Sequence, residues 1–268
     1  MAHFFRGAVA LTAALLALPA AAQSVTFTDP SGDDNGPGTY TYPTDAAYTP
    51  GSFDLTGFSA ARSAGKVTLR VELRSPLTNP WRMASGFSTQ MVLVFIQTRP
   101  KGGHTEGLPG LNVRFAPGSG WNKVVILSPQ SPARLQDEVK ARAGALRADV
   151  VLPTKLGVEG RTLEASVDAA KLGGGDPRSW SYQVLVVGNE SFPADQDLLV
   201  RRVNEYEAPA RFGGGNDGRC DPNVLDLLAG SATGDEAEKR AQYAMLHYEC
   251  AANGEGGVPA TLTLVKAR

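Results

Sequence analysis

Residues 66–73 read KVTLRVEL and form the most regular stretch of the chain. Apolar residues occupy alternate positions, at Val67, Leu69, Val71 and Leu73, and polar residues fill the positions between them. Because successive side chains of a strand point to opposite faces, this alternation predicts a β-strand with one buried and one solvated face. A fold built around such a strand needs sheets that each turn one face toward a core.

A different apolar pattern occurs at residues 91–96, which read MVLVFI without a polar interruption. A continuous run of this length is expected for a central strand that is covered on both faces. Further short strands are predicted at residues 25–27, 53–61, 112–115, 123–127, 146–152, 163–167, 182–187 and 261–265. Glycine and proline number 30 and 18 of 268 residues, well above the typical share of roughly 12%, so we expect many turns between these strands.

Helical patterns are scarce. The best candidate is residues 235–248, DEAEKRAQYAMLHY, where acidic residues open the segment and basic residues follow. Residues 168–172 predict one helical turn, and residues 128–134 predict a proline-broken connection. Many short strands with little helix predict an all-β fold, an antiparallel β-sandwich of jelly-roll or immunoglobulin-like type with one short C-terminal helix. We expect residues 23–268 to form a single β-sandwich module.

Residues 1–22 have the pattern of a signal peptide. Arg6 provides a positive start, residues 8–18 are apolar, and Ala20–Ala22 offer a small-residue cleavage site before Gln23. The apolar run is shorter than the about 20 residues that a spanning helix needs, although an uncleaved anchor is the alternative. No later stretch is long and apolar enough to span. We therefore expect a secreted, periplasmic or cell-surface protein with no membrane span after signal cleavage.

The numbers of basic and acidic residues indicate which class of partner the protein can bind. Removing Arg6 leaves 25 basic residues against 27 acidic ones, and such a balance argues against a nucleic-acid partner, which normally requires a basic face.

The two cysteines, Cys220 and Cys250, form an even pair. In an exported chain such a pair predicts a structural disulfide.

The stretch from Asp29 to Leu55, DPSGDDNGPGTYTYPTDAAYTPGSFDL, is rich in carboxylates, glycines and prolines. Its aspartates at positions 29, 33, 34 and 54 would repel one another unless a cation or a donor network lies between them. Oxygen ligands on a loop with turn-forming glycines suit calcium, which takes about six to eight oxygens. We therefore predict a structural calcium site made by Asp29, Asp33, Asp34 and Asp54. The alternative is that these residues simply form turns, and the spacing is not that of an EF-hand loop.

A second polar cluster lies in the segment GGGNDGRCDPNVLD. It could form a second metal site, or it could cap a short helix that begins near Pro222, and capping is the favoured interpretation. Its members are Asn216, Asp217, Asp221, Asn223 and Asp226.

Catalytic motifs are missing from the sequence, so we predict that the protein is not an enzyme. There is no GxSxG, no HExxH and no phosphate-binding glycine loop. Gly213–Gly215 is followed by Asn216 and not by lysine, which indicates a turn. Two histidines after the signal segment, His104 and His247, are too few for a zinc site without a third ligand.

Four aromatic residues in predicted loops are candidates for sugar binding: Tyr40, Tyr42, Trp81 and Trp121. Exposed Trp and Tyr rings bind pyranose faces because they offer apolar area with a defined face. The alternative is that these rings anchor the core or the loops, as large rings in sandwiches often do.

These motifs resemble a known family, the C-terminal binding module of glucodextranase. The resemblance rests on DPSGDDNGPGTYTYPT at 29–44, GSFDL at 51–55, NPW at 79–81, GFSTQMVLVFI at 86–96, LPG at 108–110, GW at 120–121 and RFGGGNDGRCDPNVLDLL at 211–228. It implies a β-sandwich of carbohydrate-binding type, related to DOMON and family-9 carbohydrate-binding modules, that usually accompanies a glycoside hydrolase. Here we expect a free-standing module.

The resemblance and the residues together predict an exported, non-catalytic carbohydrate-binding module that recognises an α-glucan-like polysaccharide and is stabilised by calcium. The expected partner is a polysaccharide or cell-envelope glycan, with a glycoside hydrolase encoded nearby. The alternative is a structural envelope or surface-layer protein that binds no small sugar. A haem-binding role would need an axial methionine, Met83 or Met91, together with a histidine, and the spacing does not favour it.

Overall fold

The computed structural model describes residue 1 and residues 23–216, 219–230, 235–254 and 256–266. The predicted signal peptide, apart from Met1, therefore lies outside the described residues. Over these ranges, no helix combines the length and the apolar character that crossing a membrane requires.

The first sheet has five antiparallel strands in the order β1-β2-β3-β9-β8. Its strands are β1 (Gln23–Thr28), β2 (Leu55–Ser63), β3 (Lys66–Leu73), β8 (Lys155–Glu159) and β9 (Thr162–Asp168). The predicted alternation in β3 is confirmed, because its four apolar side chains are fully buried. On its solvated face, Lys66 pairs with Asp168 and Arg70 with Glu164, each at 2.5 Å.

The second sheet has the strand order β11-β10-β4-β6-β7, and β15 also pairs with β10. Its strands are β4 (Gln90–Gln97), β6 (Lys123–Leu127), β7 (Val150–Val151), β10 (Ser181–Gly188), β11 (Asp226–Leu227) and β15 (Val265–Lys266). Residues 91–96 of β4 are at most 1% exposed, so the prediction of a central strand covered on both faces is confirmed.

The main core lies between the two sheets. Phe58 and Leu69 of the first sheet belong to the same buried cluster as Val94 and Tyr182 of the second. Burying one side chain of this size contributes about 1.5–3 kcal/mol, so the facing surfaces hold the sheets together as a sandwich.

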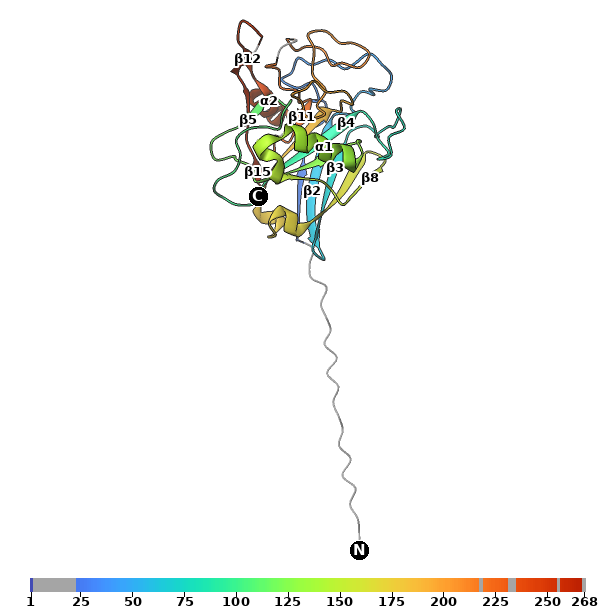
Figure 1. The fold of residues 1–268 in the computed structure, drawn as a ribbon, viewed down its shortest axis with the longest axis vertical. Coiled ribbons are helices and arrows are strands. Elements are labelled where there is room, and N and C mark those ends of the chain that lie inside the picture. Colours follow the sequence, from blue (N-terminus) through green and yellow to red (C-terminus); the bar gives the residue numbers. More distant parts are fainter. Residues whose placement is uncertain (2–22, 217–218, 231–234, 255, 267–268) are drawn as a thin grey trace.

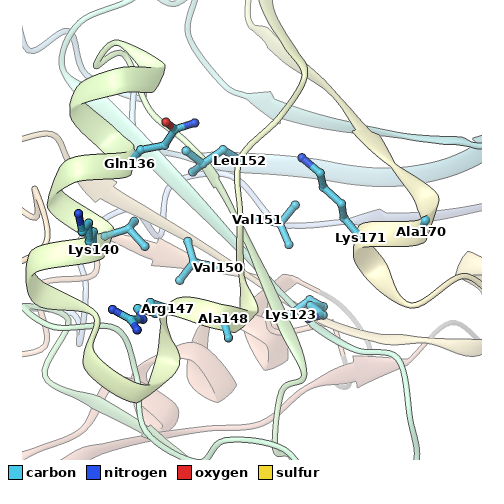
Figure 2. Close-up of a pocket in the computed structure, with 11 residues that line it drawn as sticks. Lys123, Gln136, Lys140, Arg147, Ala148, Val150, Val151, Leu152, Ala170 and Lys171 are labelled. Atoms are coloured by element: carbon cyan, nitrogen blue, oxygen red, sulfur yellow. The ribbon is translucent and has the colours of Figure 1, made fainter.

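A second core covers the outer face of the second sheet. There Phe95 clusters with Leu135 and with Leu246. The covering elements are α1 (Pro132–Arg142), the 3-10 helix η1 (Gly144–Asp149), α2 (Asp235–Leu246), β5 (Val113–Phe115) and β14 (Ala260–Leu262). Figure 1 shows α1 lying across the strands. An open cleft lies between α1, η1 and β7 (Figure 2).

Short elements complete the chain. They are the 3-10 helices η2 (Ala169–Leu172) and η3 (Pro177–Ser179) and the strand pair β12 (Glu249–Cys250) and β13 (Gly257–Val258). The helical turn predicted at 168–172 and the helix predicted at 235–248 are both present, as η2 and α2. The last predicted strand, residues 261–265, is divided into β14, which runs parallel to β5, and β15.

Two expectations for the middle of the chain are wrong, and one strand there was not predicted. The proline-broken connection at 128–134 contains the start of α1, because Ser131 accepts the Arg134 N–H at 3.3 Å and Pro132 occupies the first turn, where its missing N–H costs nothing. The strand predicted at 146–152 is mostly η1, and only Val150–Val151 reach the sheet, beside β6. Strand β8 was not predicted at all.

The disulfide prediction is confirmed, since Cys220 and Cys250 are bonded. The bridge ties the segment before β11 to β12, across a sequence separation of 30 residues. A cross-link of this span stabilises the fold chiefly by restricting the unfolded chain.

We predict that replacing both cysteines by serine lowers the free energy of unfolding by about 2–4 kcal/mol while the sandwich still forms. Urea titration followed by circular dichroism measures the change. A reducing agent should produce the same shift in the unmodified protein and none in the variant. Identical unfolding midpoints for both proteins would show that the bridge does not constrain the unfolded chain.

Candidate functional site

Five carboxylates from separate parts of the chain gather where the two sheets meet. We call them the acidic cluster: Asp29, Asp33, Asp34, Asp54 and Asp226. The first three follow β1, the fourth precedes β2, and the last begins β11 of the other sheet. The connection between two strands of the first sheet and a strand of the second sheet therefore contribute to one group.

Backbone amides hold three of these carboxylates in place. Asp54 Oδ2 accepts the Gly32 N–H at 2.7 Å, and Asp226 Oδ2 accepts the Leu55 N–H at 2.6 Å. Asp29 Oδ1 lies 3.4 Å from the Ala229 amide, which donates to it. Gly32 has φ +89°, a conformation that glycine adopts without steric cost. The loop can therefore turn back and aim its amide at Asp54.

The cluster is compact and shielded from solvent. One carboxylate oxygen from each of Asp29, Asp33 and Asp226 lies within 4.8 Å of the others. Asp33, Asp54 and Asp226 are 1%, 0% and 0% exposed. At such separations and burial, like charges repel strongly.

Three oxygens of the cluster are buried without a hydrogen-bond partner in the described part of the chain: Asp29 Oδ2, Asp33 Oδ1 and Asp54 Oδ1. Buried polar atoms in folded proteins are nearly always satisfied, and leaving a carboxylate oxygen unsatisfied is costly. A bound cation would satisfy such orphaned carboxylate oxygens.

Basic groups near the cluster are few. Arg74 Nη1 lies 3.4 Å from Asp54 Oδ2, and the guanidinium group is largely exposed. The charge of Lys239 lowers the pKa of Asp33, but burial and Asp54 outweigh it. Among the described residues, these two cations at the edge cannot balance four buried carboxylates and the half-buried Asp34.

The pKa values of the five aspartates reflect this excess of negative charge. Burial, followed by repulsion from Asp54, raises the pKa of Asp33 to about 7. Burial, followed by repulsion from Asp34, raises the pKa of Asp54 to about 6. Burial also raises the pKa values of Asp29, Asp34 and Asp226 above their usual range. Without a compensating cation, the fold therefore favours protonated carboxyl groups at this position.

The donor set suits one class of ligand. Every donor is an oxygen, and carboxylate oxygens prefer hard divalent cations such as calcium and magnesium. Asp29, Asp33 and Asp226 are close enough to share one ion, and Asp54 has a further buried oxygen without a hydrogen-bond partner in the described part of the chain. The tyrosine hydroxyl of Tyr42 donates to Asp34, so that carboxylate has its own partner.

The structure brings together the four aspartates that the sequence grouped and adds Asp226, which the sequence assigned to the second cluster. A signal for Asp226 exists in the sequence, because it lies within the apolar run Leu225 to Leu228. A carboxylate inside such a run is buried and must have a partner elsewhere. Sequence spacing alone could not identify that partner.

The second cluster does not form a unit. No helix begins at Pro222, because residues 222–225 have no regular secondary structure before β11, so the interpretation as a helix cap is wrong. Asp221 Oδ1 instead accepts the Tyr248 hydroxyl at 2.7 Å and the Asn216 N–H at 2.8 Å. Asn223 links to the backbone of Val203 and Gly110. Asp217 lies outside the described residues.

Of the four predicted sugar-binding rings, two are buried and Tyr42 is half-buried. Trp121 is 0% exposed, and its indole N–H donates to Glu106 O at 2.8 Å. Tyr40 is buried, and its hydroxyl donates to Pro222 O at 2.9 Å. The Tyr42 ring packs against Phe53 and Phe212. These three rings anchor the core and loops, so their predicted role in stacking on a sugar does not fit this packing.

Trp81 is different, since 39% of it is exposed. The guanidinium carbon of Arg201 lies 5.7 Å from the centre of its ring, a cation–π contact. Asn79 fixes the loop by bonding both the N–H and the carbonyl of Met83 at 2.8 Å. Trp81 is thus an exposed ring on a loop whose shape is already set.

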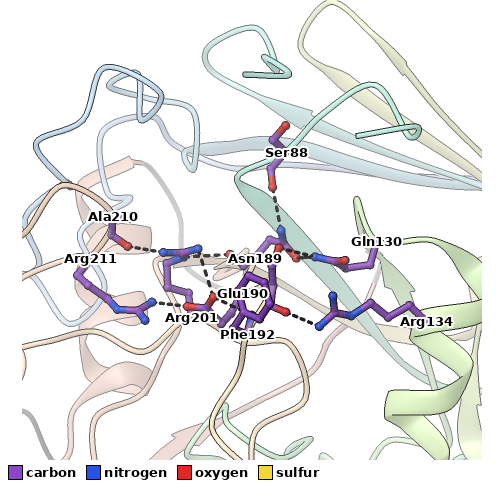
Figure 3. A network of polar contacts seen from close by, with 10 residues as sticks. Ser88, Gln130, Arg134, Asn189, Glu190, Phe192, Arg201, Ala210 and Arg211 are labelled. Carbon is purple, nitrogen blue, oxygen red and sulfur yellow. Dashed lines mark hydrogen bonds and ion pairs between the residues drawn. The ribbon is translucent and has the colours of Figure 1, made fainter. Parts of the chain in front are cut away.

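Arg201 belongs to a polar network that Figure 3 shows from close by. Its side chain donates to Asn189 O at 2.9 Å and to Ala210 O at 2.5 Å, and it lies 3.6 Å from Glu190. Arg211 also donates to Glu190. Burial alone would raise the pKa of Glu190, but the bonds from Arg211 and the Phe192 N–H hold it below its usual value. The network is therefore charged and well ordered.

Two further exposed rings lie on loops tied to this network. Phe192 is 87% exposed, and its N–H donates to Glu190 at 3.0 Å. Tyr206 is 72% exposed and precedes the turn that the Ala208–Arg211 bridge closes. We call Trp81, Phe192 and Tyr206 the aromatic loop surface. Phe192 and Tyr206 were not among the predicted rings, although each is a single aromatic residue in a polar loop, the same signal that identified Trp81.

Comparison with known protein families agrees with this architecture. Residues 25–264 match the model of the C-terminal, SLH-like binding module of glucodextranase. The match spans nearly all of the chain, and the protein belongs to this family of binding modules. None of the curated proteins matches it. The family is one of binding modules and not of catalytic domains, which agrees with the prediction of a non-enzyme.

The raised pKa values predict an unusual pH dependence of stability. A carboxyl group with a raised pKa in the folded state stabilises the fold while it is protonated, and this contribution is lost as the pH rises. In the presence of a chelator, we expect the melting temperature to fall as the pH is raised from about 4 to about 7. Differential scanning calorimetry measures this fall, and the variant Asp33→Asn should reduce it. A melting temperature that rises over this range would contradict the burial of unbalanced carboxylates.

Proposed function

We propose that the protein is an exported, non-catalytic carbohydrate-binding module that recognises an α-glucan-like polysaccharide and is stabilised by calcium. Family membership supports the binding role, because the matching module is that of glucodextranase. Export rests on the signal-peptide pattern of residues 1–22. A glycoside hydrolase encoded nearby would act on the same glycan.

The observation that carries sugar binding is the exposed ring of Trp81 above Arg201. Carbohydrate sites combine an apolar ring face with a few fixed polar groups that select hydroxyl positions. Trp81 provides such a face, and Glu190 and Arg211 lie within the network beneath it. Phe192 and Tyr206 offer further exposed apolar area on other loops. Because the loop is already ordered, little conformational entropy would be lost on binding.

The observation that supports calcium is the set of orphaned oxygens in the acidic cluster. Asp29, Asp33, Asp54 and Asp226 would hold the ion, with carbonyl groups or water completing the six to eight oxygens that calcium takes. The ion would supply the charge balance that Arg74 and Lys239 do not. Its role would be structural, since the cluster joins β11 to the start of β2.

The alternative is a structural envelope or surface-layer protein that uses the same sandwich to hold to the cell wall. The match to an SLH-like module is the observation that favours it. A pull-down of residues 23–268 on insoluble α-glucan, cellulose, chitin and purified envelope, with and without calcium, separates the two. Retention on α-glucan supports the proposed function, and retention on envelope alone supports the alternative.

For calcium, we predict that the variant Asp33→Asn is more stable than the unmodified protein in chelator but less stable in calcium. Removing one carboxylate relieves repulsion in the first condition and removes a ligand in the second. Thermal unfolding in both conditions measures the crossover, and Asp137→Asn, at an exposed carboxylate of α1, is the matched control. Equal melting temperatures in calcium and chelator for the unmodified protein would refute the metal site.

For the sugar, we predict that Trp81→Ala weakens α-glucan binding roughly tenfold, the loss expected for removing one aromatic contact of about 1.4 kcal/mol. Affinity electrophoresis in glucan-containing gels measures the change. Trp81→Phe should retain part of the affinity because it keeps a ring face, and Val258→Ala, at another exposed apolar residue, should change nothing. An unchanged affinity for Trp81→Ala would exclude this surface.

A further inference from the structure

A cleft of about 640 Å³ lies apart from both the acidic cluster and the aromatic loop surface. It is bordered by α1, η1, β7 and η2. Figure 2 shows Val150, Val151 and Leu152 along its floor, with Lys140 on the α1 side and Lys171 opposite. The volume lies within the range of about 300–1,000 Å³ that is typical of ligand sites.

The lining of this cleft is strongly positive. Four of its eleven residues are cations, Lys123, Lys140, Arg147 and Lys171, and none is acidic. The whole chain has a formal net charge of −1, so this concentration does not reflect a generally basic surface. The four cations come from β6, α1, η1 and η2, and the fold gathers them from separate elements.

Most of this charge is not balanced by nearby carboxylates. Lys123 Nζ lies 2.6 Å from Asp149, which also contacts His104 at 2.7 Å. The charge of Lys171 lowers the pKa of Asp168 without a direct contact between the two, and Asp168 forms its ion pair with Lys66. Within the described ranges, Lys140 and Arg147 form no ion pair. Cations held around one cleft repel one another, and a bound anion would relieve that repulsion.

The floor of the cleft is apolar, and this limits the choice of anion. Val139, Val150 and Leu152 offer aliphatic surface between the charged side chains, and Gln136 adds one amide at the edge. A small inorganic anion uses only the charges, whereas a sugar ring that carries a carboxylate uses both features. A nucleic acid would require an extended basic face, whereas the four cations here surround one cleft of a chain whose formal net charge is −1.

We propose that this cleft binds a carboxylate-bearing sugar unit of an acidic polysaccharide. This site is separate from the surface at Trp81, to which we assign a neutral glucan. Only the choice of a polysaccharide as the ligand rests on the proposed function. The cations bind the carboxylate, and the aliphatic floor receives the face of the ring. The module then has two separate sites for glycans of different charge.

The test measures binding of oligogalacturonate to residues 23–268 by isothermal titration calorimetry at low ionic strength, with calcium present. We expect binding that weakens as salt is added. The double variant Lys140→Met and Arg147→Met keeps the aliphatic stems but removes two charges, and it should weaken binding roughly tenfold. The matched control, Arg114→Met with Lys266→Met on β5 and β15, makes the same change in net charge away from the cleft and should bind as the unmodified protein does.

Three outcomes would overturn the proposal: no oligogalacturonate binding, equal weakening by the cleft and control variants, or inorganic phosphate that binds as tightly as the sugar. The last would reassign the cleft to small anions. Trp81→Ala should leave oligogalacturonate affinity unchanged while it weakens neutral glucan binding. Failure of the glucan experiment therefore leaves the result for the cleft interpretable.

Discussion

The repulsion between carboxylates buried where the two sheets meet is the constraint on which the rest of the structure depends. Asp226 accepts the Leu55 amide at 2.6 Å and so connects the second sheet to the start of β2. Asp54, next to that amide, fixes the turn at Gly32. The groups that join the sheets are thus the groups that repel one another. The junction needs a cation or protons, and folding is coupled to whichever is bound.

Contacts connect this junction to the exposed ring of Trp81. The Tyr42 hydroxyl donates to Asp34 and accepts the Phe53 N–H at 3.1 Å. The Phe53 ring stacks on Tyr48, and Tyr48 meets Trp81 edge to face at 6.3 Å. The acidic cluster therefore supports the aromatic layer beneath the proposed sugar surface. In this account, calcium would affect binding through the order of these loops and without touching the glycan.

Local sequence patterns predicted much of the fold, and the predictions that were wrong have physical causes. The alternation in 66–73 and the apolar run in 91–96 identified the central strands because burial alone determines them. Pro132 was misread because proline both breaks helices and starts them, and only the Ser131 cap distinguishes the two. Four aspartates of the candidate site were close in sequence and so were found. Asp226 was assigned elsewhere because its neighbours in the cluster, Asp29, Asp33 and the Leu55 amide, lie far from it along the chain, and the local sequence does not encode that contact.

The most direct test of the account is the calcium content of the purified protein, residues 23–268, after dialysis against dilute calcium and removal of free ions. Inductively coupled plasma mass spectrometry gives the stoichiometry. The account predicts one tightly held calcium ion per chain, lost in a variant that carries Asp33→Asn and Asp226→Asn together. A folded protein that retains no calcium would contradict it, because the buried carboxylates would then have to be balanced by protons alone.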